Sequence, residues 1–153
     1  VAHSFPTRRS SDLLDAGIRC IINLMEEDEP NHQGQPFRHY ATTFHHLGEA
    51  MGVQTRFARF PIRDLDVTTT HQMVETLDAI DAAIDDDLPV YVHCWGGVGR
   101  TGTVVGCWLI RHGLAEGADV FDRIRTLRAD DPVNHRESPE TTEQRRMVRT
   151  WDE

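Results

Sequence analysis

The segment from Val90 to Gly102 constrains the fold of this 153-residue chain more than any other. It opens with an apolar, β-branched run, continues through Cys94 into a loop that holds three glycines, and ends where an apolar helical pattern begins. Glycine adopts conformations that a Cβ forbids, so such a loop can curl until its backbone N–H groups converge on an anion. The pattern predicts a strand, a tight anion-binding loop and a helix that begins beside the bound anion.

Two side chains in this segment carry the expected chemistry. Cys94 ends the strand, and Arg100 follows it by six residues at the start of the helix. The positive end of the helix favours a thiolate over a thiol, and the planar guanidinium matches two phosphoryl oxygens. A cysteine that ends a buried strand is usually only a small apolar side chain, but a plain turn needs neither three glycines nor an arginine in register. We therefore expect Cys94 to be a nucleophile and Arg100 to hold a phosphate, with the hydroxyl of Thr101 donating to the thiolate.

The loop differs from other phosphate-binding and cysteine-based loops. The Gly-Lys-Ser/Thr ending of a nucleotide P-loop is replaced here by Gly99-Arg100-Thr101. A sulfurtransferase or an arsenate reductase can share a cysteine and an arginine at this spacing, but both fit the Gly-x-Gly-Arg-Thr-Gly ending less well.

The segment resembles the signature of the protein tyrosine phosphatase superfamily, His-Cys-x-x-Gly-x-x-Arg-Ser/Thr-Gly. The match has no gap and comprises His93, Cys94, Gly97, Arg100, Thr101 and Gly102. The short chain looks most like the dual-specificity and related bacterial members, and the resemblance extends more weakly from Leu14 to Trp151. It implies an α/β fold with a central, mainly parallel sheet flanked by helices, a phosphocysteine mechanism, and neither a metal nor another cofactor.

The resemblance also implies roles for the remaining loop residues. The predicted phosphate-binding residues are Trp95, Gly96, Gly97, Val98, Gly99 and Arg100. Trp95 and Val98 stand at the variable positions and are expected to shape the rim. His93 is expected to hydrogen-bond local backbone and set the geometry of Cys94.

The resemblance further implies a general acid on a separate loop. Asp64 follows a β-forming run in a Pro-x-x-Asp context, where a carboxylic acid could protonate the leaving oxygen. Asp66 is the rival for this role, and either residue could instead be a helix cap or a solvated loop side chain.

Composition limits the other function classes. The three cysteines, Cys20, Cys94 and Cys107, give neither a disulfide framework nor a zinc pattern, and a thiolate enzyme suits a reducing, cytoplasmic compartment. A net charge of −9 disfavours nucleic acid as a partner, and no apolar run reaches the length of a membrane span. His45 and His46 are adjacent without a third ligand, so we expect solvent-facing histidines there and no metal site.

The first residues carry a different signal. Residues 4–13 read as a translation of a common short-read sequencing adapter. We expect residues 1–13 to be a non-native leader, residues 14–153 to be a single phosphatase domain, and the native N-terminus to be truncated. A genomic locus that encodes residues 4–13 would contradict this hypothesis.

The rest of the chain reads as alternating elements. We expect a helix end at Leu14, a strand over 19–25, a long loop with one short helix over 26–52, a strand over 56–62, and helices over 69–87, 101–113, 120–127 and 139–151. Ser138 is expected to cap the last helix. Gln144 is expected on the surface of that helix, with contact to the site as the alternative.

These features predict a phosphomonoester hydrolase that acts on phosphotyrosine and on phosphoserine or phosphothreonine, with a phosphorylated protein or a small phosphoester as substrate. The alternatives are a phosphatase of inositol lipids or other non-protein phosphates, and a phosphoresidue-binding module without turnover. A binding module could dispense with the thiol, whereas this chain combines Cys94, Arg100 and Asp64.

Overall fold

Three short parallel strands form the centre of the molecule. The computed structural model describes residues 10–30, 33–35 and 39–153. Strands β1 (Cys20–Asn23), β2 (Arg56–Arg59) and β3 (Val90–His93) lie in the order β2-β1-β3, and both pairs are parallel. Every residue of β1 is buried because it is the middle strand and both of its faces are covered.

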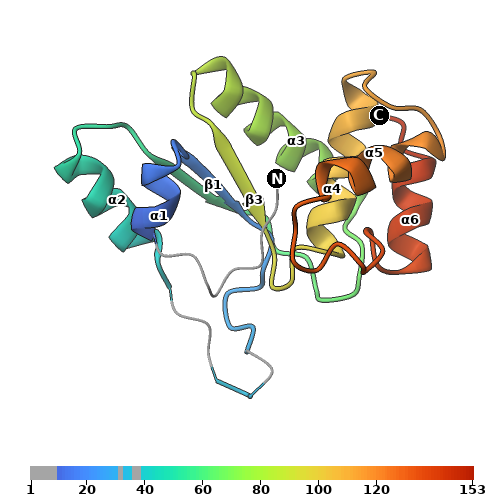
Figure 1. The fold of residues 1–153 in the computed structure, drawn as a ribbon, viewed down its shortest axis with the longest axis horizontal. Helices are drawn as coiled ribbons and strands as arrows, with labels where there is room; N and C mark the ends of the chain where they lie inside the picture. The colour runs from blue at the N-terminus through green and yellow to red at the C-terminus, as the bar shows by residue number, and fades with distance from the viewer. Residues whose placement is uncertain (1–9, 31–32, 36–38) are drawn as a thin grey trace.

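Helices cover the two faces of this sheet (Figure 1). Helices α1 (Ser10–Asp15) and α2 (Ala41–Ala50) contact each other on one side. The other side holds α3 (Thr70–Asp85), α4 (Arg100–Arg111), α5 (Asp119–Leu127) and α6 (Thr142–Arg149), with α4 touching α3, α5 and α6. The expected α/β class with a parallel sheet flanked by helices is confirmed.

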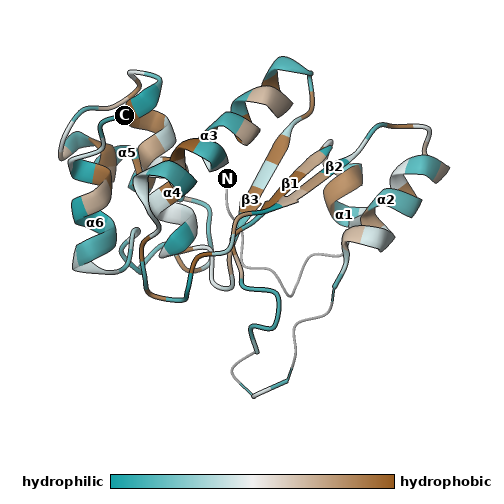
Figure 2. Ribbon diagram, turned by 180° about the vertical axis from the view of Figure 1, so that it is seen from behind, coloured by the Kyte–Doolittle hydropathy of each residue, from teal (hydrophilic) through white to brown (hydrophobic). Residues whose placement is uncertain are grey.

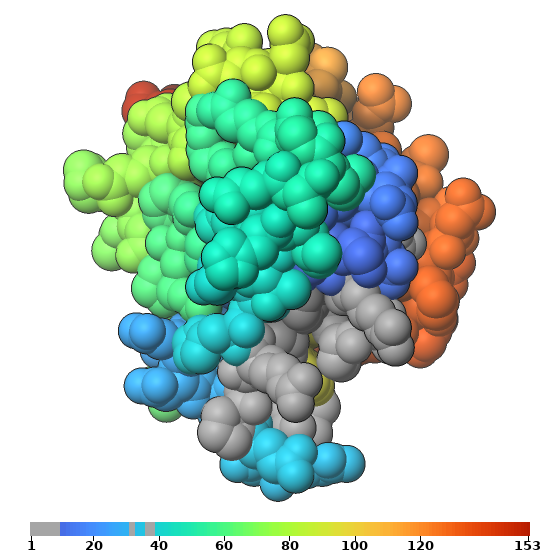
Figure 3. All heavy atoms as spheres, turned by 90° about the vertical axis from the view of Figure 1, so that its left-hand side faces the viewer, coloured from blue at the N-terminus to red at the C-terminus, as the bar shows by residue number. Residues whose placement is uncertain are grey.

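Each face of the sheet has its own apolar core, because side chains alternate along a strand. Cys20 and Ile22 of β1 belong to the larger cluster under α3 to α6, whereas Ile21 and Tyr91 belong to a smaller cluster with α1 and α2. The apolar strands between the mixed surfaces of the helices are visible in Figure 2. Figure 3 shows α2 and α1 lying side by side on the side of the molecule that holds the smaller cluster.

Most of the predicted elements are present. The strands, α3 and α6 are shorter than predicted, whereas α4 and α5 each begin one residue earlier than predicted. The hydroxyl of Thr69 accepts from the backbone of Gln72 and starts α3, and Gly113 follows α4 with a φ of 64°. The prediction that Ser138 caps the last helix is wrong. Thr141 is the N-cap of α6 and forms a capping box with Gln144, whereas the hydroxyl of Ser138 donates to the carbonyl of Val98, 2.6 Å away.

The N-terminal helix includes part of the segment that we expect to be a non-native leader. Leu13 is 1% exposed and packs in the smaller core beside Leu14. Residues 1–9 lie outside the described part of the chain, so the origin of residues 1–13 stays a prediction. No helix in the described residues is long and apolar enough to cross a membrane.

Candidate active site

The loop between β3 and α4 brings Cys94 and Thr101 together. Cys94 is 2% exposed, and the Thr101 hydroxyl donates to its Sγ at 3.0 Å. Gly97 has a φ of 69°, a conformation that a side chain disfavours, and α4 begins at Arg100. The loop therefore places the sulfur next to a hydroxyl donor and next to the positive end of a helix.

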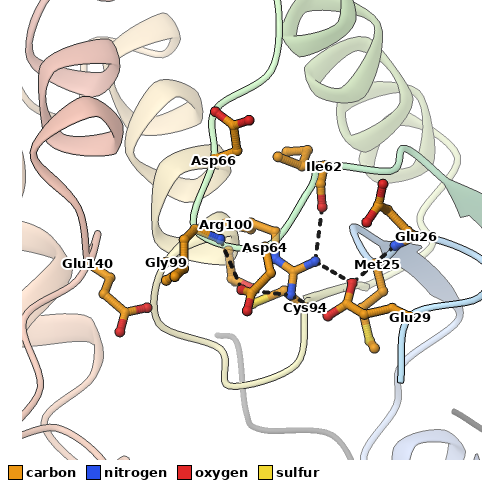
Figure 4. A network of polar contacts seen from close by, with 12 residues as sticks. Met25, Glu26, Glu29, Ile62, Asp64, Asp66, Cys94, Gly99, Arg100 and Glu140 are labelled. Carbon is orange, nitrogen blue, oxygen red and sulfur yellow. Dashed lines mark hydrogen bonds and ion pairs between the residues drawn. The ribbon is translucent and has the colours of Figure 1, made fainter. Parts of the chain in front are cut away.

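Arg100 lies almost fully buried at the centre of a polar network (Figure 4). Its Nη1 and Nη2 donate to the two carboxylate oxygens of Glu29, each at 2.7 Å, and Nη1 also donates to the carbonyl of Ile62 at 2.9 Å. Burial lowers the pKa of Arg100, but the hydrogen bonds to Glu29 and the nearby negative groups outweigh it, and the net shift is upward. The guanidinium is therefore a permanent cation held in one orientation.

Glu29 is a site residue that the sequence did not reveal. It belongs to the acidic run 26–29, which reads as a solvated loop, and it is 71 residues away from Arg100 in the chain. No local pattern marks which of these carboxylates turns inward. The only signal available in the sequence is that a buried arginine needs a carboxylate partner somewhere.

Replacing Glu29 by glutamine is expected to lower kcat/KM on an aryl phosphate by about 10- to 100-fold, because the guanidinium loses the bidentate partner that aligns it. The unfolding free energy is expected to fall by up to about 3 kcal/mol, since a buried charge loses its counterion. Inorganic phosphate should stabilise this variant more than the wild type, because an anion replaces the missing charge. Thermal unfolding with and without phosphate measures this difference.

Glu27→Gln is the matched control, because this side chain is exposed and lies two residues away in the same acidic run. If Glu29→Gln behaves like Glu27→Gln in both measurements, Glu29 does not position Arg100.

The two candidate acids occupy different places. Asp64 Oδ1 lies 3.2 Å from Nη2 of Arg100, and the side chain of Asp64 is 59% exposed. The Asp66 side chain accepts from its own neighbour, Val67 N, and lies away from Cys94 in Figure 4. A tight turn separates the two residues, with Leu65 at a φ of 65°. The structure thus brings Asp64, and not Asp66, to the guanidinium.

Gln144 is buried between the loop that carries Asp64 and Asp66 and the loop between β3 and α4. The prediction that it lies on the surface is therefore wrong. It is 0% exposed, and its Nε2 donates to the Asp66 carbonyl at 3.1 Å. A Cβ on Gly99 would lie 3.0 Å from the Gln144 amide, and one on Gly102 would lie 2.0 Å from Ser138 Oγ. Both glycines therefore permit a close approach of the chain that follows α5. The capping-box spacing from Thr141 to Gln144 could have identified the true start of α6.

His93 supports the loop from beneath. It is fully buried, its Nδ1 lies 3.0 Å from the Cys94 carbonyl, and its Nε2 contacts the Tyr40 hydroxyl. Burial lowers the pKa of His93 from 6.5 to about 4, so the ring is neutral at pH 7. A neutral ring that donates through Nδ1 accepts the Tyr40 proton at Nε2, and this geometry supports the expected local role of His93.

The low pKa of His93 predicts an acid-sensitive fold. The folded state disfavours the charged ring, so it binds the proton less readily than the unfolded state does. The part of the folding stability that depends on a neutral His93 is therefore fully present above pH 6.5 and is lost as the pH falls from 6.5 towards 4. The loss attributable to His93 is about 3 kcal/mol. Urea unfolding of the wild type and of His93→Gln between pH 7 and pH 4 should show a steeper decline for the wild type.

His71→Gln is the control for this experiment, because the His71 side chain is 85% exposed. Equal pH slopes for the wild type and His93→Gln would contradict the assignment.

The two other cysteines and the variable residues of the phosphate loop are also placed by the structure. Burial raises the pKa of Cys20 to about 11 and that of Cys107 to about 12, so both are protonated thiols in the core. Trp95 is half-buried. The prediction that Val98 shapes the rim is wrong, because its side chain is 1% exposed and its carbonyl accepts a hydrogen bond from the Ser138 hydroxyl. Its backbone stays a candidate for phosphate binding.

The adjacent histidines of α2 do not form a cluster of ligands. His45 Nδ1 lies 2.6 Å from the Thr55 hydroxyl, and His46 is exposed. In residues 10–30, 33–35 and 39–153, no three His, Cys, Asp or Glu side chains are grouped to hold a metal ion.

The arrangement of strands and helices matches solved phosphatase structures. Tk-PTP in its active form superimposes with a TM-score of 0.67 at 23% identity, covering 96% of this chain and 86% of that one. DUSP15 gives a TM-score of 0.65 at 17% identity over 96% of this chain and 78% of its own. The PP-IP phosphatase SIW14 of S. cerevisiae gives 0.65 at 18% identity over 99% of this chain and 79% of its own. The fold is that of the tyrosine and dual-specificity phosphatases.

Sequence comparison identifies the family within this class. Residues 6–114 match the family model described as polymorphic toxin system, DSP-PTPase phosphatase, and the chain belongs to this family. It is also 30% identical over 95 residues to protein tyrosine phosphatase domain-containing protein 1 of Bos taurus, and 31% identical over 98 residues to that of Mus musculus. These matches cover 61% and 63% of this chain but only 12% and 13% of the relatives.

Proposed function

We propose that this chain hydrolyses phosphomonoesters on proteins, removing phosphate from phosphotyrosine and from phosphoserine or phosphothreonine. The observation that carries the proposal is the convergence of three groups, Cys94 and Arg100 from the loop between β3 and α4, and Asp64 from a separate loop. The Thr101 hydroxyl lies 3.0 Å from Cys94 Sγ, and Asp64 lies 3.2 Å from the buried guanidinium of Arg100. A nucleophile, a fixed cation and a carboxylic acid are the groups that phosphoryl transfer through cysteine needs.

The reaction proceeds in two displacements. The Cys94 thiolate attacks phosphorus in line, the bond to the leaving oxygen breaks, and Asp64 gives that oxygen its proton. Water then attacks the phosphocysteine with Asp64 as the base, and the released thiolate is stabilised by the Thr101 hydroxyl. Arg100 and the backbone N–H groups of residues 95–99 hold the equatorial oxygens throughout.

The Glu29 pair leaves room for this role of Arg100. Glu29 and Ile62 take donors on Nη1 and Nη2, whereas Asp64 is the contact that a phosphoryl oxygen would displace. A displaced, exposed Asp64 is free to face the leaving oxygen. Asp64 can therefore protonate the leaving oxygen only after a bound phosphate has replaced it at the Arg100 guanidinium.

A reducing compartment such as the cytoplasm suits this chemistry, since the nucleophile must stay a free thiol. All three cysteines are free in the structure. The family to which the chain belongs is described for polymorphic toxin systems, which supports a role of this phosphatase within such a system.

Steady-state kinetics on a substrate panel tests the proposal. The panel contains p-nitrophenyl phosphate, matched phosphotyrosine, phosphoserine and phosphothreonine peptides, and inositol phosphates. We expect turnover of the aryl phosphate and the peptides, with inhibition by vanadate. Turnover restricted to inositol phosphates would establish a non-protein phosphatase, and tight peptide binding without turnover would establish a binding module.

A further inference from the structure

The loop that carries Asp64 is attached firmly at its two ends. At its start, the backbone N–H of Ile62 donates to the carbonyl of Leu24, just after β1, at 2.9 Å. At its end, Thr69 is the N-cap of α3. The position of Asp64 therefore depends on what holds residues 63–68 between these two ends.

The turn in the middle of this loop is strained. The backbone N–H of Asp66 donates to the Arg63 carbonyl at 3.0 Å, which closes a turn around Asp64 and Leu65. Leu65 has a φ of 65°, a left-handed conformation that a residue with a side chain keeps only where the surrounding structure enforces it. We therefore expect a contact from outside the loop to hold this turn.

Two polar contacts join residues 63–68 to other elements within the described part of the chain. One is the ion pair between Asp64 and Arg100, at 3.2 Å. The other is the hydrogen bond from Nε2 of Gln144 to the carbonyl of Asp66, at 3.1 Å. In the proposed reaction a phosphoryl oxygen displaces the first contact, so the second is the polar contact that remains while the proton is transferred.

The side-chain amide of Gln144 is held in one orientation. Gln144 is fully buried on α6, and its Oε1 accepts from the backbone N–H groups of Glu140 and Thr141, each at 3.1 Å. Because the oxygen is engaged by these two donors, the amide presents Nε2 to the Asp66 carbonyl. The same amide lies against the phosphate loop, since a Cβ on Gly99 would come within 3.0 Å of both of its polar atoms. Gln144 thus links the loop that carries the acid to the loop that binds phosphate.

We propose that Gln144 is a positioning residue that keeps Asp64 beside the leaving oxygen after the substrate has displaced Asp64 from Arg100. The inference rests on the proposed function, in which Asp64 is the general acid. Gln144 needs no contact with the substrate, because it acts through the Asp66 carbonyl and the turn. Its contribution is therefore to protonation of the leaving group and not to binding of the phosphate.

Two substitutions remove this hydrogen bond in different ways. Gln144→Glu keeps an acceptor for the backbone of Glu140 and Thr141, as a capping box allows, but a carboxylate cannot donate to the Asp66 carbonyl. Gln144→Met removes the donor without adding a charge. Thr141→Ala is the matched control, because it weakens the same helix cap while leaving the bond from Gln144 to Asp66 in place.

The slope of log kcat/KM against the leaving-group pKa, over a series of aryl phosphates, measures protonation of the leaving oxygen. We expect both Gln144 variants to lose about 10- to 100-fold on a phosphotyrosine peptide, but less than about threefold on an aryl phosphate with a strongly acidic phenol. Inhibition of Gln144→Met by inorganic phosphate should stay within about twofold of the wild type. Thr141→Ala should keep the wild-type slope. In an Asp64→Asn background, the loss caused by Gln144→Met should fall below about twofold, because Gln144 acts through Asp64.

Hydrogen exchange supplies a readout that needs no turnover. In the Cys94→Ser variant saturated with inorganic phosphate, adding Gln144→Met should speed amide exchange in residues 63–68 by about tenfold or more. Adding Thr141→Ala should leave the exchange of these residues unchanged.

The outcomes separate this inference from the proposed function. A wild-type slope in both Gln144 variants, or unchanged exchange in residues 63–68, would overturn the inference. A loss confined to Gln144→Glu would also overturn it, as an effect of the added charge, and so would an equal loss on every aryl phosphate, as general structural support. An Asp64→Asn variant without leaving-group dependence would count against the proposed function instead, whereas the exchange rates would still decide whether Gln144 holds the loop.

Discussion

Cys94→Ser is expected to leave less than a hundredth of the wild-type kcat on every substrate while phosphate esters still bind. A serine hydroxyl cannot supply an alkoxide near neutral pH, whereas the Cys94 sulfur is a stronger nucleophile and accepts a hydrogen bond from the Thr101 hydroxyl at 3.0 Å. The Arg100 guanidinium and its bond to Glu29 do not involve the sulfur, so the anion site persists. Stopped-flow kinetics and calorimetric titration with a phosphopeptide measure the two effects.

Cys107→Ala provides the control, because Cys107 is fully buried in α4 and its raised pKa keeps it protonated. It should cost some stability but retain turnover. Residual activity of Cys94→Ser above a hundredth of the wild type would remove Cys94 from the role of nucleophile.

Asp64→Asn is expected to lower kcat/KM by about 10²- to 10⁴-fold on phosphotyrosine, but much less on an aryl phosphate whose phenol is strongly acidic. The physical reason is that a poor leaving group needs a proton and a good one does not. Asp64 stands 3.2 Å from Arg100, where a phosphate would bring the leaving oxygen within its reach. The slope of log kcat/KM against the leaving-group pKa, measured over a series of aryl phosphates, is the readout.

Asp66→Asn is the matched control, since it removes the same charge two residues away on the same loop. Its side chain caps Val67 N, and its carbonyl is held by Gln144, so it should show no leaving-group dependence. A leaving-group-dependent loss in Asp66→Asn, with none in Asp64→Asn, would assign the acid to Asp66.

Local patterns predicted the parts of the site that lie within one segment. The strand, the glycine loop and the start of α4 follow from residues 90–102, because the backbone conformation there is dictated by adjacent side chains. Asp64 was found because the resemblance implies an acid on a separate loop and Asp64 follows a β-forming run in a Pro-x-x-Asp context. Helix α3 was visible as apolar positions at three- and four-residue spacing on one face, and α4 as an almost wholly apolar run typical of a central helix.

The contacts between distant segments could not be predicted in this way. Glu29 is one of several carboxylates in a polar run, and only the folded chain determines which of them reaches Arg100. Gln144 looked like a surface residue because a polar side chain on a short amphipathic helix usually faces water. It is buried here because its amide satisfies the backbone of Glu140, Thr141 and Asp66 at once.

The parallel sheet has a consequence for the kinetics of folding. Each strand pair joins distant parts of the chain, since Cys20 pairs with Arg56 and with Val90 and no hairpin links any two strands. Such non-local pairs require long loops to close before they contribute energy, so the sheet forms slowly compared with its helices. The Glu29–Arg100 contact spans 71 residues and depends on that sheet. During refolding, helical circular dichroism should therefore recover before enzymatic activity, which appears only with the slowest phase of sheet assembly.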